Sequence, residues 1–255
     1  MPFLRSQLRL CYIIDATVIN DCNIVDHCRS LLDAGLTTLL FRIESESLKT
    51  AVLSELHKVT QMCLDAGRYV FSIDDMVLAS QLACSGVFFS EMPNTRILHR
   101  ARELLGGNKF IGVTVNNHSA AQEAEHSHNA PHIDFIGVGP VLQYGEKETQ
   151  ALGIESAQSI TALLRPKPLF WLGGIQNETL HDFTNSFADG VGVVRTLTKS
   201  NPAPEARKLH ITLARKLGPS VWSVGHAPED VSFRFNNLST ECLKSTEIPT
   251  STAKI

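Results

Sequence analysis

Charged and polar side chains recur directly after short apolar runs of this sequence, at positions where strands are expected to end. When strands of an α/β fold run parallel, their carboxyl ends meet at one edge, and reactive side chains gather there. The expected strand ends carry Asp15, Arg42, Glu44, Asp74, Asp75, Ser90, Glu91, Thr114 and Asn116. These residue types can bind anions through arginine or divalent cations through carboxylates.

Asp74 and Asp75 close the apolar run at residues 69–73 with two adjacent carboxylates. Hard oxygen ligands at a strand end suit Mg²⁺, which takes one or two carboxylates together with water and substrate phosphate. An aspartate before a helix also caps its first turn. Both roles are open for Asp75, whereas capping is the favoured role for Asp74.

Two cations are candidates for holding an anionic ligand. Arg42 stands late in an apolar run at residues 38–43, where an unpaired charge is costly to bury. It is therefore expected to face either a ligand phosphate or a carboxylate, with Glu44 and Asp75 as the protein partners. Lys147 lies in a charged loop long enough to cover a site as a lid, although a solvated lysine is the simpler interpretation.

A glycine-containing stretch near the end of the chain predicts a phosphate anchor. The apolar run at residues 169–172 is followed by Gly173 and Gly174, and a second run with Gly190 ends at Arg195 and Thr196. Glycines allow backbone N–H groups to approach an anion closely. In a (β/α)₈ barrel the loops after strands 7 and 8 commonly form such a site.

The apolar runs alternate with segments of helical spacing about eight times between residues 10 and 216. This alternation predicts an α/β fold, a single-domain (β/α)₈ TIM barrel over residues 1–217, with a doubly wound sheet as the alternative. Residues 218–255 are rich in Ser, Thr, Asn and Pro and show no period. They predict an irregular tail that is either disordered or packed on the surface.

Composition excludes several function classes. The 255 residues carry a formal charge of −3 and no large basic cluster, so neither nucleic-acid nor membrane binding is expected. The six cysteines show no C-x-x-C pair, which favours a reducing compartment and a cytoplasmic protein. The expected partners are small phosphorylated metabolites, and a homo-oligomer is left open.

The motifs, taken in order, resemble those of thiamine-phosphate synthase and its TenI-type relatives. The resemblance spans residues 10 to 213 and is clearest at residues 110–115, 134–141 and 152–153. It continues in Gly-Gly-Ile at residues 173–175 and in residues 188–194. It implies a compact TIM barrel that joins an aminopyrimidine diphosphate to a thiazole phosphate and releases pyrophosphate, with Mg²⁺ and cations neutralising the leaving group.

The match at the diphosphate end is partial. Of the family's Gln-x-Arg-x-Lys, only Arg42 is present, and Glu44 replaces the lysine. The resemblance assigns metal binding to Asp75, with Asp74 beside it, and offers Glu91 in place of a second metal aspartate that is missing. Mg²⁺ is therefore a doubtful cofactor.

Other positions match the family's residues more closely. Thr114 replaces the strand-five serine, and Lys147 retains the lysine of the lid. At the thiazole-phosphate end the glycines Gly173, Gly174 and Gly190 are present, and Arg195, followed by Thr196, replaces a serine.

Three functions follow from these observations. The first is a thiamine-phosphate synthase-like transferase, with full, weak or altered activity left open. The second is a non-catalytic paralogue that binds a phosphorylated metabolite or a partner protein, because several charge-assisted contacts are lost at the diphosphate end. The third is another phosphosugar-type barrel enzyme with reassigned loops.

Overall fold

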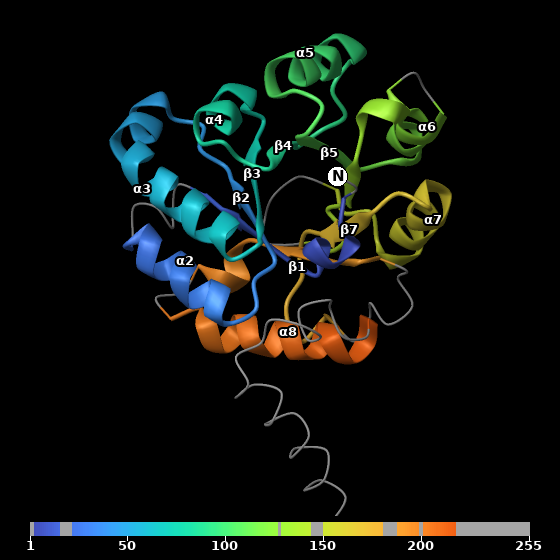
Figure 1. The fold of residues 1–255 in the computed structure, drawn as a ribbon. Coiled ribbons are helices and arrows are strands. Elements are labelled where there is room, and N and C mark those ends of the chain that lie inside the picture. The colour runs from blue at the N-terminus through green and yellow to red at the C-terminus, as the bar shows by residue number, and fades with distance from the viewer. Residues whose placement is uncertain are drawn as a thin grey trace, which may run out of the picture. The chain divides into compact units, whose positions relative to one another are not determined.

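The chain forms a closed barrel of eight parallel strands in the order β1 to β8, surrounded by helices (Figure 1). The computed structural model describes residues 3–15, 22–126, 129–143, 150–180, 188–198 and 201–217. The expected (β/α)₈ barrel is confirmed, and the doubly wound sheet is wrong because β8 pairs with β1 and closes the sheet.

The strands are short, and every described α-helix except α4 is at least nine residues long. The strands are β1 (Leu10–Ile14), β2 (Thr38–Phe41), β3 (Tyr69–Ile73), β4 (Gly86–Phe89), β5 (Phe110–Val115), β6 (Phe135–Val138), β7 (Leu169–Leu172) and β8 (Gly190–Val193). The α-helices are α2 (Ile24–Asp33), α3 (Glu46–Asp65), α4 (Met76–Gln81), α5 (Thr95–Leu105), α6 (His118–His126), α7 (Ile154–Leu164) and α8 (Ala203–Leu217), and the short 3₁₀ turns are η1 (Arg5–Leu8), η2 (Ala130–His132) and η4 (Arg195–Leu197).

Residues alternate along each strand between two apolar cores. One set, including Tyr12 and Trp171, faces the surrounding helices. The other set fills the interior of the barrel and includes Leu40, Phe88 and Phe170. This period of two decides which side chains beyond each strand end point into the mouth of the barrel.

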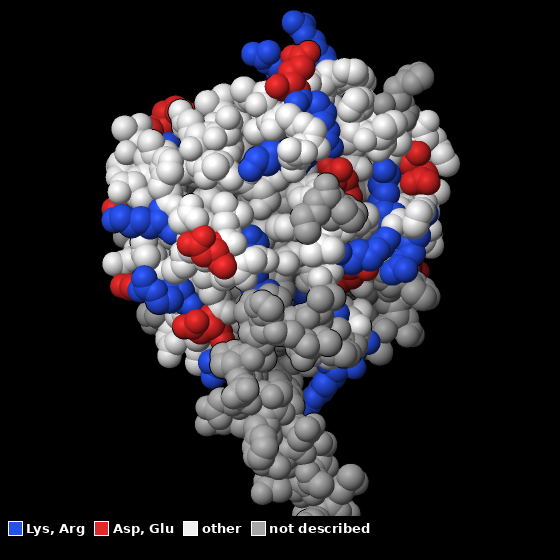
Figure 2. All heavy atoms as spheres, viewed as in Figure 1, with Lys and Arg blue, Asp and Glu red and all other residues white. Residues whose placement is uncertain are grey.

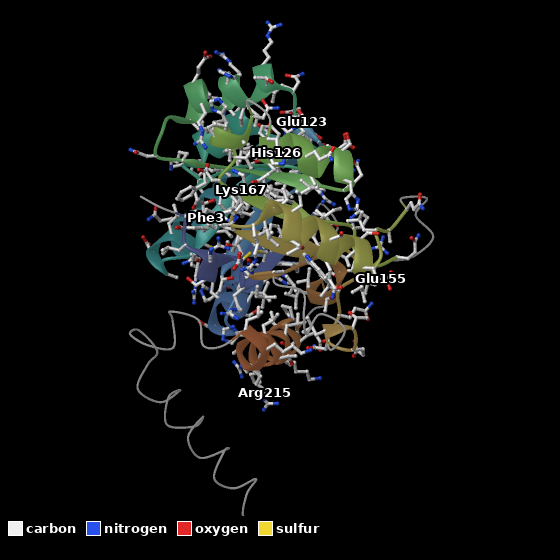
Figure 3. The ribbon with its side chains drawn as sticks, turned by 90° about the vertical axis from the view of Figure 1, so that its right-hand side faces the viewer. Phe3, Glu123, His126, Glu155, Lys167 and Arg215 are labelled. Carbon is white, nitrogen blue, oxygen red and sulfur yellow. The ribbon has the colours of Figure 1, made fainter. Side chains whose placement is uncertain are left out.

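The amino-terminal end of the barrel is closed by aromatic packing. Phe3 lies against Tyr69, Phe110 and Phe135, with ring centroids 5.2, 5.0 and 4.7 Å away. These three residues begin β3, β5 and β6, so Phe3 covers the starts of the strands. Figure 3 shows Phe3 at this end and Glu155, in the first turn of α7, toward the other end, where the strands finish.

Two aspartates shorten strands that the sequence predicts to be longer. The carboxylate of Asp134 accepts from Ile111 N at 2.7 Å, and that of Asp189 accepts from Leu169 N at 2.9 Å. Each side chain therefore bonds the neighbouring strand just before β6 or β8 begins. The apolar pattern predicts strands over residues 133–138 and 188–194, and both strands start two residues later.

Helix starts follow side-chain capping, with one correction. Asn23, Ser45 and Asn94 cap α2, α3 and α5 by accepting backbone N–H bonds. Ser119, with Gln122 three residues later, has the capping-box pattern and predicts that α6 starts at Ser119. This start is wrong, because Asn117 Oδ1 accepts from Ala120 N at 2.8 Å and the helix begins at His118.

Three further expectations concern a helix, the tail and the surface of the protein. The helix predicted between β7 and β8, and the tail at 218–255, lie wholly or mostly outside the described residues, so both stay predictions. Within the described ranges no helix is both long and apolar enough to cross a membrane. Basic and acidic side chains are interspersed on the face seen in Figure 2.

Candidate active site at the carboxyl ends of β2 to β4

A cavity of about 420 Å³ opens where β2, β3 and β4 end. It brings together three residues that the sequence predicts for the site, Arg42, Asp74 and Asp75. Glu44 and Ser90, which the sequence also places at expected strand ends, line the cavity too, together with Ile43, Lys49 and Ile73. Segments more than forty residues apart in the chain meet here because the barrel aligns their strand ends.

Arg42 supplies a cation at this cavity. It follows β2 directly, its backbone N–H donates to Ile14 O at 2.8 Å, and its place in the alternation matches that of inward-facing Leu40. Neither Glu44 nor Asp75 forms the ion pair with Arg42 that the sequence offers as an alternative, and no other described residue does. The guanidinium is available to an anionic ligand.

Asp75 has both oxygens engaged. Its Oδ1 accepts from Leu78 N at 2.8 Å and caps α4, and its Oδ2 lies 2.5 Å from Lys49 Nζ. Lys49 Nζ also lies 2.6 Å from Glu46 Oε1. Capping is thus confirmed for Asp75, and Lys49 is a partner that the sequence prediction does not include.

These bonds shift the pKa values of both Asp75 and Lys49. Burial alone would raise the pKa of Asp75, but the bonds from Leu78 N and Lys49 hold this pKa below its usual value. The hydrogen bonds to Asp75 and then to Glu46 raise the pKa of Lys49. Both side chains therefore stay ionised at neutral pH.

Asp74 joins β3 to β4 and does not cap the helix. Its backbone takes a left-handed conformation with φ of 56°, which is uncommon for a residue other than glycine. Its Oδ1 accepts from Ser90 N at 2.8 Å, and its own N–H donates to Phe88 O at 2.9 Å. The expected capping role for Asp74 is wrong because the chain turns one residue later.

This donor set does not fit the Mg²⁺ site that the resemblance implies. The oxygens of Asp75 already bind Lys49 and Leu78 N, and Asp74 accepts from Ser90 N. Glu91 is exposed and does not line the cavity. Among described residues, no three His, Cys, Asp or Glu side chains gather in a way that could hold a metal ion.

Thr114 lies apart from this cavity. It is a buried residue near the end of β5, on the inward-facing side of the strand, opposite Gly137 of β6. It does not line the cavity. Lys147 lies outside the described residues, so its expected role as a lid residue stays a prediction.

The glycine pair after β7 is needed for close packing. Gly173 and Gly174 have φ of +90° and +69°, and a Cβ on either would lie 2.6 Å from Pro140 or Leu142. The turn therefore lies flat against the loop that follows β6. Nearby, Thr196 Oγ1 donates to Ile175 O at 2.9 Å, which ties η4 to the same turn.

The structure brings Thr196 and exposed Arg195 to this turn but not Gly190. Gly190 begins β8, and a Cβ there would lie 1.8 Å from Leu8 O. Because all strands run parallel, the first residue of β8 lies at the end opposite the turn after β7. The expected grouping of Gly190 with the other two glycines is corrected accordingly.

Lys49 is the site residue that sequence reasoning misses. It stands in the first turn of α3, three residues after Glu46, in a segment whose charge pattern resembles an ordinary solvated helix face. One feature of the sequence does point to Lys49. It follows Arg42 by seven residues, and a helix that begins soon after a strand has its first turn beside the end of that strand.

These features define a (β/α)₈-barrel protein whose candidate site lies at the face where enzymes of this fold act. The family profile described as thiamine monophosphate synthase matches residues 10–197. The chain therefore belongs to the thiamine monophosphate synthase family, and the resemblance found in the sequence is confirmed.

Individual relatives agree with this assignment. The chain is 25% identical over 200 residues to thiamine-phosphate synthase 1 of Streptococcus pneumoniae, covering 77% of this chain and 92% of the relative. It is 30% identical over 181 residues to thiamine-phosphate synthase of Nostoc punctiforme, covering 70% and 49%. The structure of thiamine phosphate pyrophosphorylase from Pyrococcus furiosus matches with a TM-score of 0.72 at 21% identity, covering 85% and 100%.

Proposed function

We propose that this chain is a transferase that couples an aminopyrimidine diphosphate to a thiazole phosphate and releases pyrophosphate. In this reaction the bond between the pyrimidine methylene carbon and the diphosphate oxygen breaks, and a bond from that carbon to the thiazole nitrogen forms. The observation that carries the proposal is Arg42, which has no ion-pair partner among the described residues and lines a cavity at the strand ends of a chain from this family.

The proposed role of Arg42 is to bind the diphosphate. A guanidinium presents several N–H donors in one plane and binds phosphate oxygens in pairs. Charge that develops on the leaving group is stabilised best by donors already in place, because no reorganisation is then needed during the reaction. Thr114 is proposed to orient the pyrimidine from the inward side of β5, and Lys147 to approach the diphosphate from its loop.

The thiazole phosphate is proposed to bind at the turn after β7. The turn of Gly173 and Gly174 follows the end of β7, and Thr196 and Arg195 lie on the adjoining turn. Two phosphate sites at different strand ends would hold the two substrates toward each other.

Incubation with both precursors tests the proposal, with thiamine phosphate measured by its fluorescence after oxidation. Turnover in wild type and a loss of about a hundredfold or more in Arg42→Gln would support it. Lys58→Gln, which removes an exposed cation from α3, serves as the control of equal charge change. Absence of turnover together with retained binding of thiazole phosphate would instead support a non-catalytic binding protein.

A further inference from the structure

The ion pair between Lys49 and Asp75 lies at the centre of the candidate site. The pair lines both the cavity at the strand ends and a second hollow of about 390 Å³ between α3 and α4. The side chains of Lys49 and Asp75 are only 14% and 20% exposed. The ion pair and this burial hold the ammonium group of Lys49 at the cavity wall, whereas a solvent-exposed lysine would rotate freely.

We propose that the Lys49 ammonium group takes the place of a divalent cation at this site, so that Lys49 and Arg42 together bind a diphosphate without metal. This inference rests on the proposed function, because it concerns the same diphosphate. It follows from the disagreement between the described donor set and the implied Mg²⁺ site.

The hydrogen-bonding capacity of the two cations supports this inference. An ammonium group has three N–H donors, and Asp75 and Glu46 accept two of those of Lys49. No third partner is found among the described residues, so one donor remains for a ligand at the cavity that Lys49 lines. Arg42 lines the same cavity, and no described residue accepts a hydrogen bond from its side chain.

The negative charges of the carboxylates at the cavity do not prevent an anion from binding. Lys49 neutralises Asp75, and Asp74 accepts a backbone bond from Ser90. Glu44 is exposed, so water and salt screen its charge. A bound metal would have to displace Lys49 from a bond of 2.5 Å before reaching Oδ2 of Asp75.

Binding of inorganic pyrophosphate, measured by calorimetry with EDTA and again with excess Mg²⁺, tests this assignment without any turnover. Wild type is expected to bind in EDTA, with an affinity that Mg²⁺ changes by less than about threefold. Lys49→Gln is expected to lose about tenfold or more in EDTA, the usual effect of one charge-assisted contact. Because this change frees Asp75, Mg²⁺ is expected to restore part of the binding.

Two further variants separate charge from folding. Lys49→Arg keeps a cation beside Asp75 and is expected to retain more binding in EDTA than Lys49→Gln. Lys58→Gln is the matched control on the same helix and is expected to bind as wild type does. Thermal unfolding of each variant verifies that the barrel is intact.

The possible results distinguish the inference from the proposed function. Wild type that binds pyrophosphate only with Mg²⁺ would overturn the role of Lys49 and leave the proposed transferase standing. Equal binding by Lys49→Gln and wild type in EDTA would also overturn it. Absence of binding under both conditions would overturn the diphosphate site itself, and with it both proposals.

Discussion

Comparison of two replacements of Asp75 separates its capping bond from its ion pair. Asp75→Ala removes the acceptor of Leu78 N and the partner of Lys49 together. Loss of a cap costs about 0.5–2 kcal/mol. Loss of the partly buried pair adds about 1 kcal/mol, above the typical exposed pair but limited because Lys49 keeps Glu46. We expect a total loss of about 2 kcal/mol in the free energy of unfolding.

Asp75→Asn is the informative partner of this variant. Asparagine keeps an oxygen for Leu78 N and is a good cap, so only the ion pair is lost and the expected cost is about 1 kcal/mol. Urea unfolding followed by circular dichroism measures both values. Asn94→Ala calibrates the method, since Asn94 caps α5 through Ile97 N at 3.0 Å and has no ion pair; its expected cost is about 1 kcal/mol.

The pH dependence provides a second check on Asp75. Its pKa is lowered in the folded state, so its stabilising contribution is complete above the unfolded value of 3.8 and is lost as pH falls through the folded value. The difference between wild type and Asp75→Asn should therefore shrink in acid. Equal costs for the Asn and Ala variants, or no cost for either, would refute the division into cap and pair.

Three more predictions follow from the site, the barrel and a buried histidine. Arg42→Gln should weaken pyrophosphate binding about tenfold or more by calorimetry, and unchanged affinity would remove Arg42 from the site. Gly190→Ala should destabilise the barrel by more than about 2 kcal/mol in urea, because its Cβ would meet Leu8 O, whereas Gly107→Ala, with open space around it, should cost less than about 0.5 kcal/mol. Burial lowers the pKa of His27, so unfolded chains bind the proton first and stability should fall as pH drops below 6.5; a His27→Gln variant with the same slope would contradict this.

Local patterns anticipated most of the architecture. The bounds of β1, β3, β4 and β7 follow from apolar runs between polar turns, because strands buried on both faces need continuous apolar sequence. The observed strand starts differ from the predicted ones where a side chain accepts a hydrogen bond from the backbone of another strand. Because of such bonds to Asp134 and Asp189, β6 and β8 start later than predicted, and no local sequence pattern indicates these bonds.

The site was anticipated only in part, because the order of residues along the chain does not show which of them meet in space. Arg42, Asp74 and Asp75 stand at strand ends, and the barrel brings strand ends to one edge. Motif order groups Gly190 with Gly173 and Gly174, although Gly190 starts its strand instead of ending it. The sequence does not single out Lys49, because it lies on a helix, where a charged residue indicates a solvated face.

The amino-acid sequence alone determined the eight-fold alternation, the barrel, the family and the candidates at the strand ends, because these depend on local periodicity and the order of motifs. Tertiary structure alone decided which charges meet. Lys49 and Asp75 are 26 residues apart in the chain, and their pairing depends on how α3 returns beside the end of β3. Ion pairs form over a few ångströms of space, and no pattern along one chain encodes that distance.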